Sequence, residues 1–264
     1  MPIERLLDAI PLWGMFVIVL VLVLGSVEFG FRLGSGRVRK HEGARQASSG
    51  TLVAATMGLL AFMLAFTFGQ GWSRFDTRRL LVIGEANAIR AAFLRTDLLS
   101  EPQRTESRTL LREYVGGRVS GLSEGRLAAT LARSQQIHQR LWDIAAAAAK
   151  QQVGPSAGMF AQSVSEIITL HFKRERAGLH SRIPTAVLGA LLFLATLAMA
   201  SMGYHVGLAA ERTPFVMFSL AFAFSAVMFL ICDLDRSREG SLRVSQQALI
   251  ELGRTIGAPE QITE

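Results

Sequence analysis

Two phenylalanines and a glutamine are spaced four residues apart in one long apolar stretch. Phe62, Phe66 and Gln70 lie nearly on one face of a helix, and Gly58 lies on that face one turn earlier. In an oligomer arranged around an axis, such a face could form a narrow apolar constriction that gates ions by dewetting. The alternative is that both rings meet lipid or the core of one subunit, because phenylalanine is ordinary in membrane helices.

A second stripe on the same stretch contains only small residues. Ala61, Ala65 and Gly69 recur at every fourth position, and small side chains allow neighbouring helices to approach closely. We therefore predict that the helix packs through this stripe and presents its aromatic rings on an adjacent face.

Three arginines follow the end of the apolar stretch. Arg74, Arg78 and Arg79 share one side of a helix by their spacing, and Glu85 and Asn87 are candidate partners for them. A ring of such arginines beneath a pore would concentrate anions. The alternatives are that the arginines contact lipid phosphate groups and that Glu85 is a solvated helix residue.

The sequence shows no catalytic or metal-binding pattern. Its five histidines are scattered, and neither an H-E-x-x-H pattern nor a phosphate-loop or nucleophile-elbow pattern occurs. His171 and Glu175 are one helical turn apart, but two possible ligands do not make a zinc site. No acidic or basic residue lies deep inside an apolar stretch, which disfavours proton-coupled transport. We therefore expect no enzyme, no cofactor and no metal, and we favour a passive pore or a sensor.

The chain that carries these residues has the composition of a membrane protein. Half of its 264 residues are hydrophobic, which is unusual for a soluble protein of this length. Four stretches lack charge over the length that a membrane-spanning helix requires, namely 10–27, 52–72, 184–208 and 214–232. The first is interpreted as a retained span and not as a cleaved signal peptide, because its apolar run is long and a convincing cleavage site is missing.

The segment between the second and third spans is long enough for a domain of its own. Its apolar residues recur at helical spacing and no segment alternates with period two, so we predict an all-α fold. The expected order is 1–72 with spans 1 and 2, 73–183 as a helical extramembrane domain, 184–232 with spans 3 and 4, and 233–264 as a cytosolic C-terminal tail. No proline occurs between Thr51 and Glu101, so the second span can continue as one helix into the domain.

The net charge of +7 comes mostly from arginines next to the apolar stretches. Arginines in this position are explained by contact with lipid headgroups and by the enrichment of basic residues on the cytoplasmic side of membrane spans. We therefore do not predict nucleic-acid binding. Four spans place both termini and the helical domain on one side of a cell membrane, and the basic residues that flank the domain indicate the cytoplasm. The predicted partners are the lipid bilayer, permeant small ions and further copies of the chain.

Two blocks of the sequence resemble a known family. The first runs from Gly58 to Leu99, with LAFTF in the span, RFDTRRLLVIGEANAI leaving it and AAFLRTDLL behind it, and LLREYV follows at 110–115. The second is DLDRSREGSLRVSQQAL at 233–249. These blocks resemble bestrophin-like bacterial membrane proteins, a family long catalogued as a domain of unknown function.

The resemblance implies an oligomeric ion channel, typically a pentamer that conducts anions in animals. Its pore would pass an apolar neck on the second helix, which favours Phe62 and Phe66 as the neck. A third apolar ring is missing, and only Asp233 and Asp235 match the acidic cluster of calcium-activated members, so we predict no calcium clasp. The alternative function is a non-conducting membrane scaffold or signalling protein whose helical domain binds a soluble partner.

Overall fold

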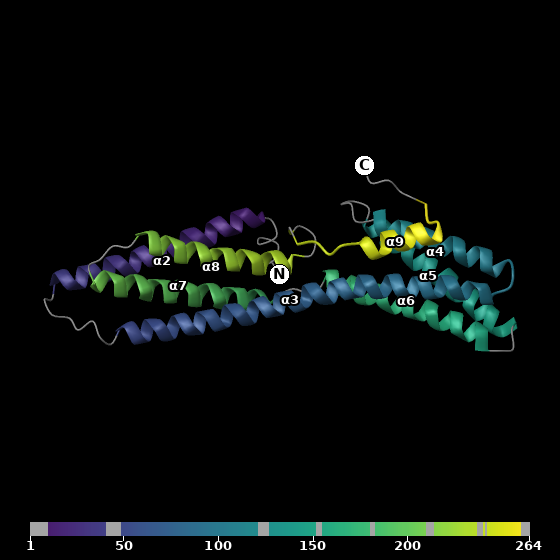
Figure 1. The fold of residues 1–264 in the computed structure, drawn as a ribbon, viewed down its shortest axis with the longest axis horizontal. Helices are drawn as coiled ribbons and strands as arrows, with labels where there is room; N and C mark the ends of the chain where they lie inside the picture. Colours follow the sequence, from purple (N-terminus) through teal and green to yellow (C-terminus); the bar gives the residue numbers. More distant parts are fainter. Residues whose placement is uncertain are drawn as a thin grey trace. The chain divides into compact units, whose positions relative to one another are not determined.

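The computed structural model describes residues 10–40, 49–120, 127–151, 155–179, 183–209, 214–236, 240 and 242–259. Every regular element in these ranges is helical (Figure 1), so the predicted all-α fold is confirmed. The elements are α2 (Leu12–Lys40), α3 (Ser49–Arg95), the short 3-10 helix η1 (Thr96–Leu98), α4 (Gln103–Ser120), α5 (Leu127–Gln151), α6 (Pro155–Leu179), α7 (Thr185–Leu208), α8 (Pro214–Asp235) and α9 (Gln247–Ile256).

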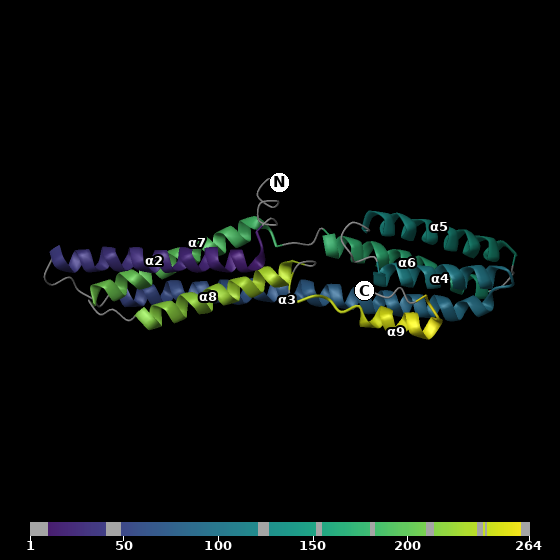
Figure 2. The ribbon, with the colours of Figure 1, turned by 90° about the horizontal axis from the view of Figure 1, so that it is seen from above.

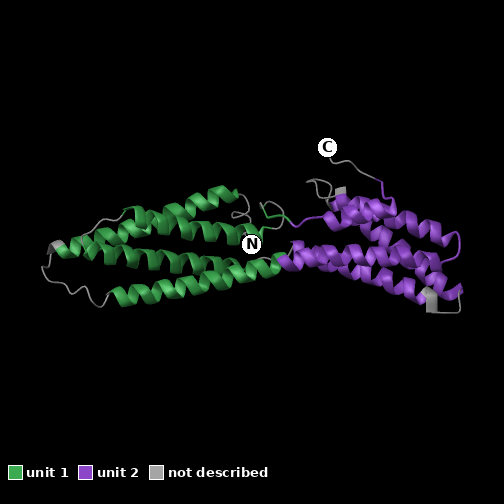
Figure 3. Ribbon diagram, in the orientation of Figure 1, with its two compact units in different colours: residues 1–75, 182–243 green, residues 76–181, 244–264 purple. Residues whose placement is uncertain are grey.

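The chain divides into two compact units, which Figure 3 shows in different colours. Unit 1 comprises residues 1–75 and 182–243, and unit 2 comprises residues 76–181 and 244–264. Helix α3 contributes its first part to unit 1 and its last part to unit 2. It is continuous over 47 residues, as the lack of proline in this stretch predicts.

Four helices are long and apolar enough to cross a membrane, and unit 1 contains three of them, α2, α7 and α8, together with the first part of the fourth, α3. Each predicted span lies within, or within two residues of, one of them. Side chains such as Val23, Met199 and Ile231 form the shared core. Proline marks two of the helix starts, because Pro184 precedes α7 and Pro214 is the first residue of α8.

Helices α2 and α7 of unit 1 approach each other closely through glycines. A Cβ atom at Gly30 would lie 2.0 Å from the carbonyl oxygen of Ala200, and one at Gly203 would lie 2.1 Å from that of Val27. Gly34 and Gly207 repeat this pattern one turn further along. Both helices therefore carry a G-x-x-x-G motif that brings their backbones together.

Unit 2 is a helical bundle built from the end of α3 with α4, α5, α6 and α9 (Figure 2). Its core contains fully buried Ile89, Leu111, Leu141 and Phe160, and Leu249 of α9 packs into the same core. Helix α9 ends at Ile256, and Gly257 caps it in a left-handed conformation with a φ of 68°. The structure thus adds a packed helix within the segment for which the sequence predicted only a tail.

Candidate functional site

The face of α3 that carries the predicted pore-lining residues is uncovered in this chain. Phe62 is 62% exposed and Phe66 is 56% exposed, and Gly58 and Gln70 are exposed as well. The other side of the helix packs inward, since Leu60 is buried in the core of unit 1. Helix α3 therefore packs on its own subunit through one face and leaves the two rings free. Their role as a neck stays a prediction.

The small-residue stripe of α3 is uncovered too. Ala61, Ala65 and Gly69 are exposed, and a Cβ atom at Gly69 would meet no atom within 4 Å. The described part of the chain therefore makes no close helix contact through this stripe, and its packing role stays a prediction. The small-residue contact within the subunit is the α2–α7 pair, which the sequence analysis missed although both G-x-x-x-G motifs are legible in the sequence.

The three predicted arginines have different surroundings. Arg74 lies near Asp235 of α8, with 3.8 Å between its Nη1 and the Oδ1 of the carboxylate. Arg78 is buried, whereas Arg79 is exposed. The suggested pairing with Glu85 is wrong, because Glu85 is buried and pairs with arginines of α4 and α6, and Asn87 is exposed. Of the three positive charges, that of Arg79 is the most accessible to ions in water.

Glu85 is the centre of a buried ionic cluster in unit 2. Its carboxylate accepts a hydrogen bond from the hydroxyl of Tyr114 at 2.5 Å and lies 3.3 Å from the guanidinium of Arg118. It also accepts a short hydrogen bond from Arg174, which donates in turn to the side chain of Gln246. The cluster connects α3, α4 and α6 with the segment that precedes α9. One carboxylate thus faces two guanidinium groups.

Two histidines complete the buried cluster. His171 lies with its Nδ1 3.0 Å from the hydroxyl oxygen of Tyr114, and the rings of His138 and His171 meet edge to face with centroids 4.7 Å apart. Tyr114 has one proton and gives it to Glu85, so neutral His171 donates its Nδ1–H to Tyr114. Nε2 of His171 then carries a lone pair, and it is buried without a hydrogen-bond partner, as is Nε2 of His138.

The surroundings of the cluster shift its pKa values. Burial opposes the ionisation of Glu85, but Arg118 and Arg174 outweigh it and hold the pKa of Glu85 below its ordinary value. Burial, with nearby Glu85, raises the pKa of Tyr114 well above its ordinary value. Burial lowers the pKa of His138 and of His171 to about 4. At neutral pH the cluster therefore contains a carboxylate, two guanidinium groups and neutral rings.

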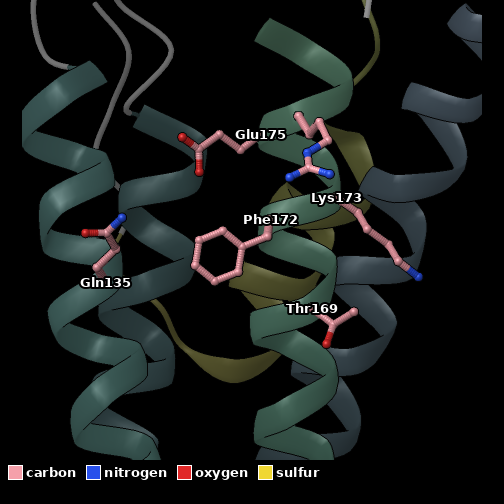
Figure 4. A pocket seen from close by; sticks show the side chains of 6 residues that line it. Gln135, Thr169, Phe172, Lys173 and Glu175 are labelled. Carbon is pink, nitrogen blue, oxygen red and sulfur yellow. The ribbon is translucent and has the colours of Figure 1, made fainter. Parts of the chain in front are cut away.

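An open cavity of about 580 Å³ lies beside the cluster, between α5 and α6. Its lining residues are Gln135, Thr169, Phe172, Lys173, Glu175 and Arg176. Figure 4 shows Phe172 and Lys173 pointing in different directions from α6, so the side chains do not converge on one reacting point. The carboxylate of Glu175 is 4.0 Å from Nε2 of His171, which is too long for a hydrogen bond. This geometry matches no catalytic arrangement of acid, base and nucleophile.

No group of three or more histidine, cysteine, aspartate or glutamate side chains in the described part of the chain could hold a metal ion. His171 and Glu175 remain a pair, as their spacing in the sequence indicates. His138 was not among the candidate residues, because its proximity to His171 arises only when α5 packs on α6.

Solved structures share this fold. The chain is similar to a variant of a bacterial bestrophin homologue from Klebsiella pneumoniae with a TM-score of 0.69 and 16% identity, over 91% of this chain and 97% of that one. A second variant of that homologue gives a TM-score of 0.68 at 16% identity over 91% and 98% of the two chains. A structure described only as a membrane protein gives 0.69 at 16% identity over 91% and 97%.

Sequence comparison leads to the same family. No curated protein matches the chain. The family model described as Bestrophin-like domain matches residues 17–249, which include three of the four candidate spans in full, most of the first span and most of unit 2. Because this match covers most of the chain, the protein belongs to the Bestrophin-like family.

Proposed function

We propose that this chain is one subunit of a homo-oligomeric, bestrophin-like ion channel in the cell membrane. Helix α3 of each subunit would face the axis, and Phe62 and Phe66 would form its apolar neck between Gly58 and Gln70. Unit 2 and both termini would lie in the cytoplasm. The resident partners would be lipid and other copies of the chain, with small ions as the permeating species.

The uncovered face of α3 carries this proposal. Here the two large rings share their face with Gly58 and Gln70, and the stripe of Ala61, Ala65 and Gly69 lies on an adjacent face; all of these residues are exposed. Small residues favour close helix contact, and a ring of phenylalanines can close a pore to water. The family supports the same assignment, since bestrophin homologues share the fold.

The proposed channel selects anions over cations. Arg74, Arg78 and Arg79 follow the neck on α3, and repeated around an axis they would attract anions. Arg79 has the most accessible charge of the three. Replacing Arg79 by glutamate should therefore move the reversal potential in a salt gradient towards that of the cation. A reversal potential unchanged by this substitution would remove Arg79 from the conduction path.

Single-channel recording of the purified protein in planar bilayers tests the pore. Under a salt gradient, we expect currents from the wild type and larger or persistently open currents from the double variant Phe62→Ala/Phe66→Ala, because the apolar constriction is gone. Phe193→Ala is the matched control, since Phe193 is 69% exposed on α7, outside the proposed pore. It should conduct as the wild type does.

Two results would contradict the proposal. Silence from all variants at verified incorporation would favour the scaffold function, in which unit 2 binds a soluble partner. Equal currents from the wild type and the double variant would keep a pore but remove both rings from its wall.

A further inference from the structure

His171 of the buried cluster faces a carboxylate that it does not bind. Its Nε2 atom lies 4.0 Å from Oε2 of Glu175, which is one turn later on the same helix. Neutral His171 already donates its Nδ1–H to Tyr114, so Nε2 presents a lone pair. The lone pair and the carboxylate oxygen are both hydrogen-bond acceptors. The contact therefore lacks only a proton.

Glu175 is placed to close this gap. Its side chain is 28% exposed and belongs to the lining of the cavity between α5 and α6, whereas the side chain of His171 is fully buried. Figure 4 shows Phe172 and Glu175 extending from α6 towards the helix that carries Gln135. A charge-assisted hydrogen bond is about 2.8 Å long, so the two atoms need to approach by roughly 1 Å. A small rotation of a half-exposed side chain supplies such a shift.

The charges around His171 decide whether it can hold a second proton. The titratable and charged groups that surround it are Glu85 of α3, Tyr114 and Arg118 of α4, His138 of α5, and Arg174 and Glu175 of α6. Burial, followed by the charge of Arg118, lowers the pKa of His171 to about 4. Glu85 favours the charged imidazole, but it already faces two guanidinium groups. A protonated His171 therefore needs a second carboxylate in contact, and Glu175 is the one beside it.

His138 is a poorer site for the same proton. Its Nε2 is also buried without a hydrogen-bond partner in the described part of the chain. The residues one turn away from it on α5 are Ser134 and Trp142, neither of which carries a charge. The rings of His138 and His171 have centroids 4.7 Å apart, so a positive charge on one opposes a positive charge on the other. The first proton therefore goes to His171.

Tyr114 connects this histidine to α3. Its hydroxyl accepts the hydrogen bond from His171 and donates one to Glu85 of α3 at 2.5 Å. Glu85 also binds Arg174, three residues after His171 on α6. A charge added to His171 thus acts on the groups that hold the end of α3 in unit 2, and α3 is continuous with the span that carries Phe62 and Phe66.

We propose that His171 and Glu175 form a proton-operated switch in unit 2. On acidification His171 takes up a proton at Nε2, and the carboxylate of Glu175 moves from the cavity onto this new N–H donor. The rearrangement around Glu85 then shifts the balance between open and closed channel. This last step rests on the proposed function, whereas the contact between His171 and Glu175 does not.

A double-mutant cycle at two pH values tests the contact in the full chain in detergent. His171→Asn keeps an N–H donor near the position of Nδ1 but takes up no proton, and Glu175→Gln removes the charge with little change in shape. We expect no coupling between the two substitutions at pH 7.5. At pH 5 the unfolding equilibrium constants should show a coupling of roughly threefold or more. Glu166→Gln is the matched control, because Glu166 is an exposed carboxylate of the same helix, and it should not couple to His171→Asn at either pH.

The cycle rejects the switch if the coupling at pH 5 equals that at pH 7.5. A second comparison does not depend on the folding of His171→Asn. Between pH 7.5 and pH 5, Glu175→Gln alone should lose more stability than Glu166→Gln, because only Glu175 compensates a charged His171. Equal losses in these two variants would likewise overturn the switch.

Single-channel recording tests the step from the switch to the pore. The open probability of the wild type should change between pH 7.5 and pH 5, and this change should be smaller in both His171→Asn and Glu175→Gln but not in Glu166→Gln. An identical pH response in all four proteins would reject the regulation of the channel. Silence from all of them, together with coupling at pH 5, would reject the channel and its regulation and leave only the contact in place.

Discussion

Replacing Glu85 by glutamine tests whether the buried cluster holds unit 2 together. The carboxylate is fully buried, and the side chains of its two arginine partners are each 12% exposed. Glutamine has nearly the same shape but no charge, so Arg118 and Arg174 would be left close together without a counter-ion. Breaking a buried ion pair by removing one partner costs about 3–5 kcal/mol. The hydrogen bond from Arg174 to Gln246 remains and does not neutralise either charge.

Thermal unfolding in detergent measures this loss. A loss of that size corresponds to a fall in the midpoint of about 6–20 °C, at roughly 2–4 °C per kcal/mol for a chain of this size class. Hydrogen exchange should locate the change, because amides of α4 and α6 would exchange faster while those of α7 would not. Glu113→Gln is the matched control, since Glu113 and Arg133 form an ion pair at 2.6 Å with half-exposed side chains. Surface pairs of this kind contribute about 0–1 kcal/mol.

A midpoint for Glu85→Gln equal to that of Glu113→Gln would refute the reasoning, because the carboxylate would then contribute no more than a surface pair. The double variant Glu85→Gln/Arg174→Gln gives an internal check. It removes one of the two stranded charges, so it should be more stable than Glu85→Gln alone, and a further loss of stability would show that repulsion between the arginines is not the cause.

Three further predictions concern pH, helix packing and the cysteine. Burial lowers the pKa values of His138 and His171 from 6.5 to about 4, so the unfolded chain binds more protons than the folded chain in this range. Unit 2 should therefore lose stability as the pH falls from 6.5 towards 4, by at most about 1.4 kcal/mol per pH unit for each histidine. Chemical denaturation at pH 7.5 and at pH 5 measures this loss, and equal free energies of unfolding would contradict it. Gly203→Ala should destabilise the fold by about 1–3 kcal/mol through overpacking and so lower the melting midpoint. Gly25→Ala on α2, where a Cβ meets no atom within 4 Å, should leave the midpoint unchanged, and equal midpoints for the two variants would contradict the close contact. Cys232 is 7% exposed, so a maleimide should label it only after denaturation in SDS, and rapid labelling of the native protein would place it elsewhere.

Local sequence determined the spans and the continuity of α3. A membrane interior offers no hydrogen-bond partner to the backbone, so a spanning segment must be helical and apolar over a fixed length, and that length is legible without any tertiary information. The lack of proline between Thr51 and Glu101 likewise acts within one helix. The spacing of Phe62, Phe66 and Gln70 on one helical face follows from the same local geometry.

Tertiary packing decided which charges meet. Glu85 was considered as a partner of nearby arginines or as a solvated residue, but its partners Tyr114, Arg118 and Arg174 lie 29, 33 and 89 residues away in the chain. No local spacing encodes such distances, because they depend on how α4 and α6 pack on α3. The proximity of His138 to His171, and the packing of α9 into unit 2, have the same origin.

The exposed faces of α3 were also beyond the sequence. Leu80 and Leu94 have the same chemical character as buried Leu111, and only the arrangement of neighbouring helices leaves them uncovered. Hydrophobicity shows that a side chain gains free energy by leaving water, but it does not show which surface covers it. The sequence therefore determined how each helix is built, and the tertiary structure decided which of its faces remain uncovered.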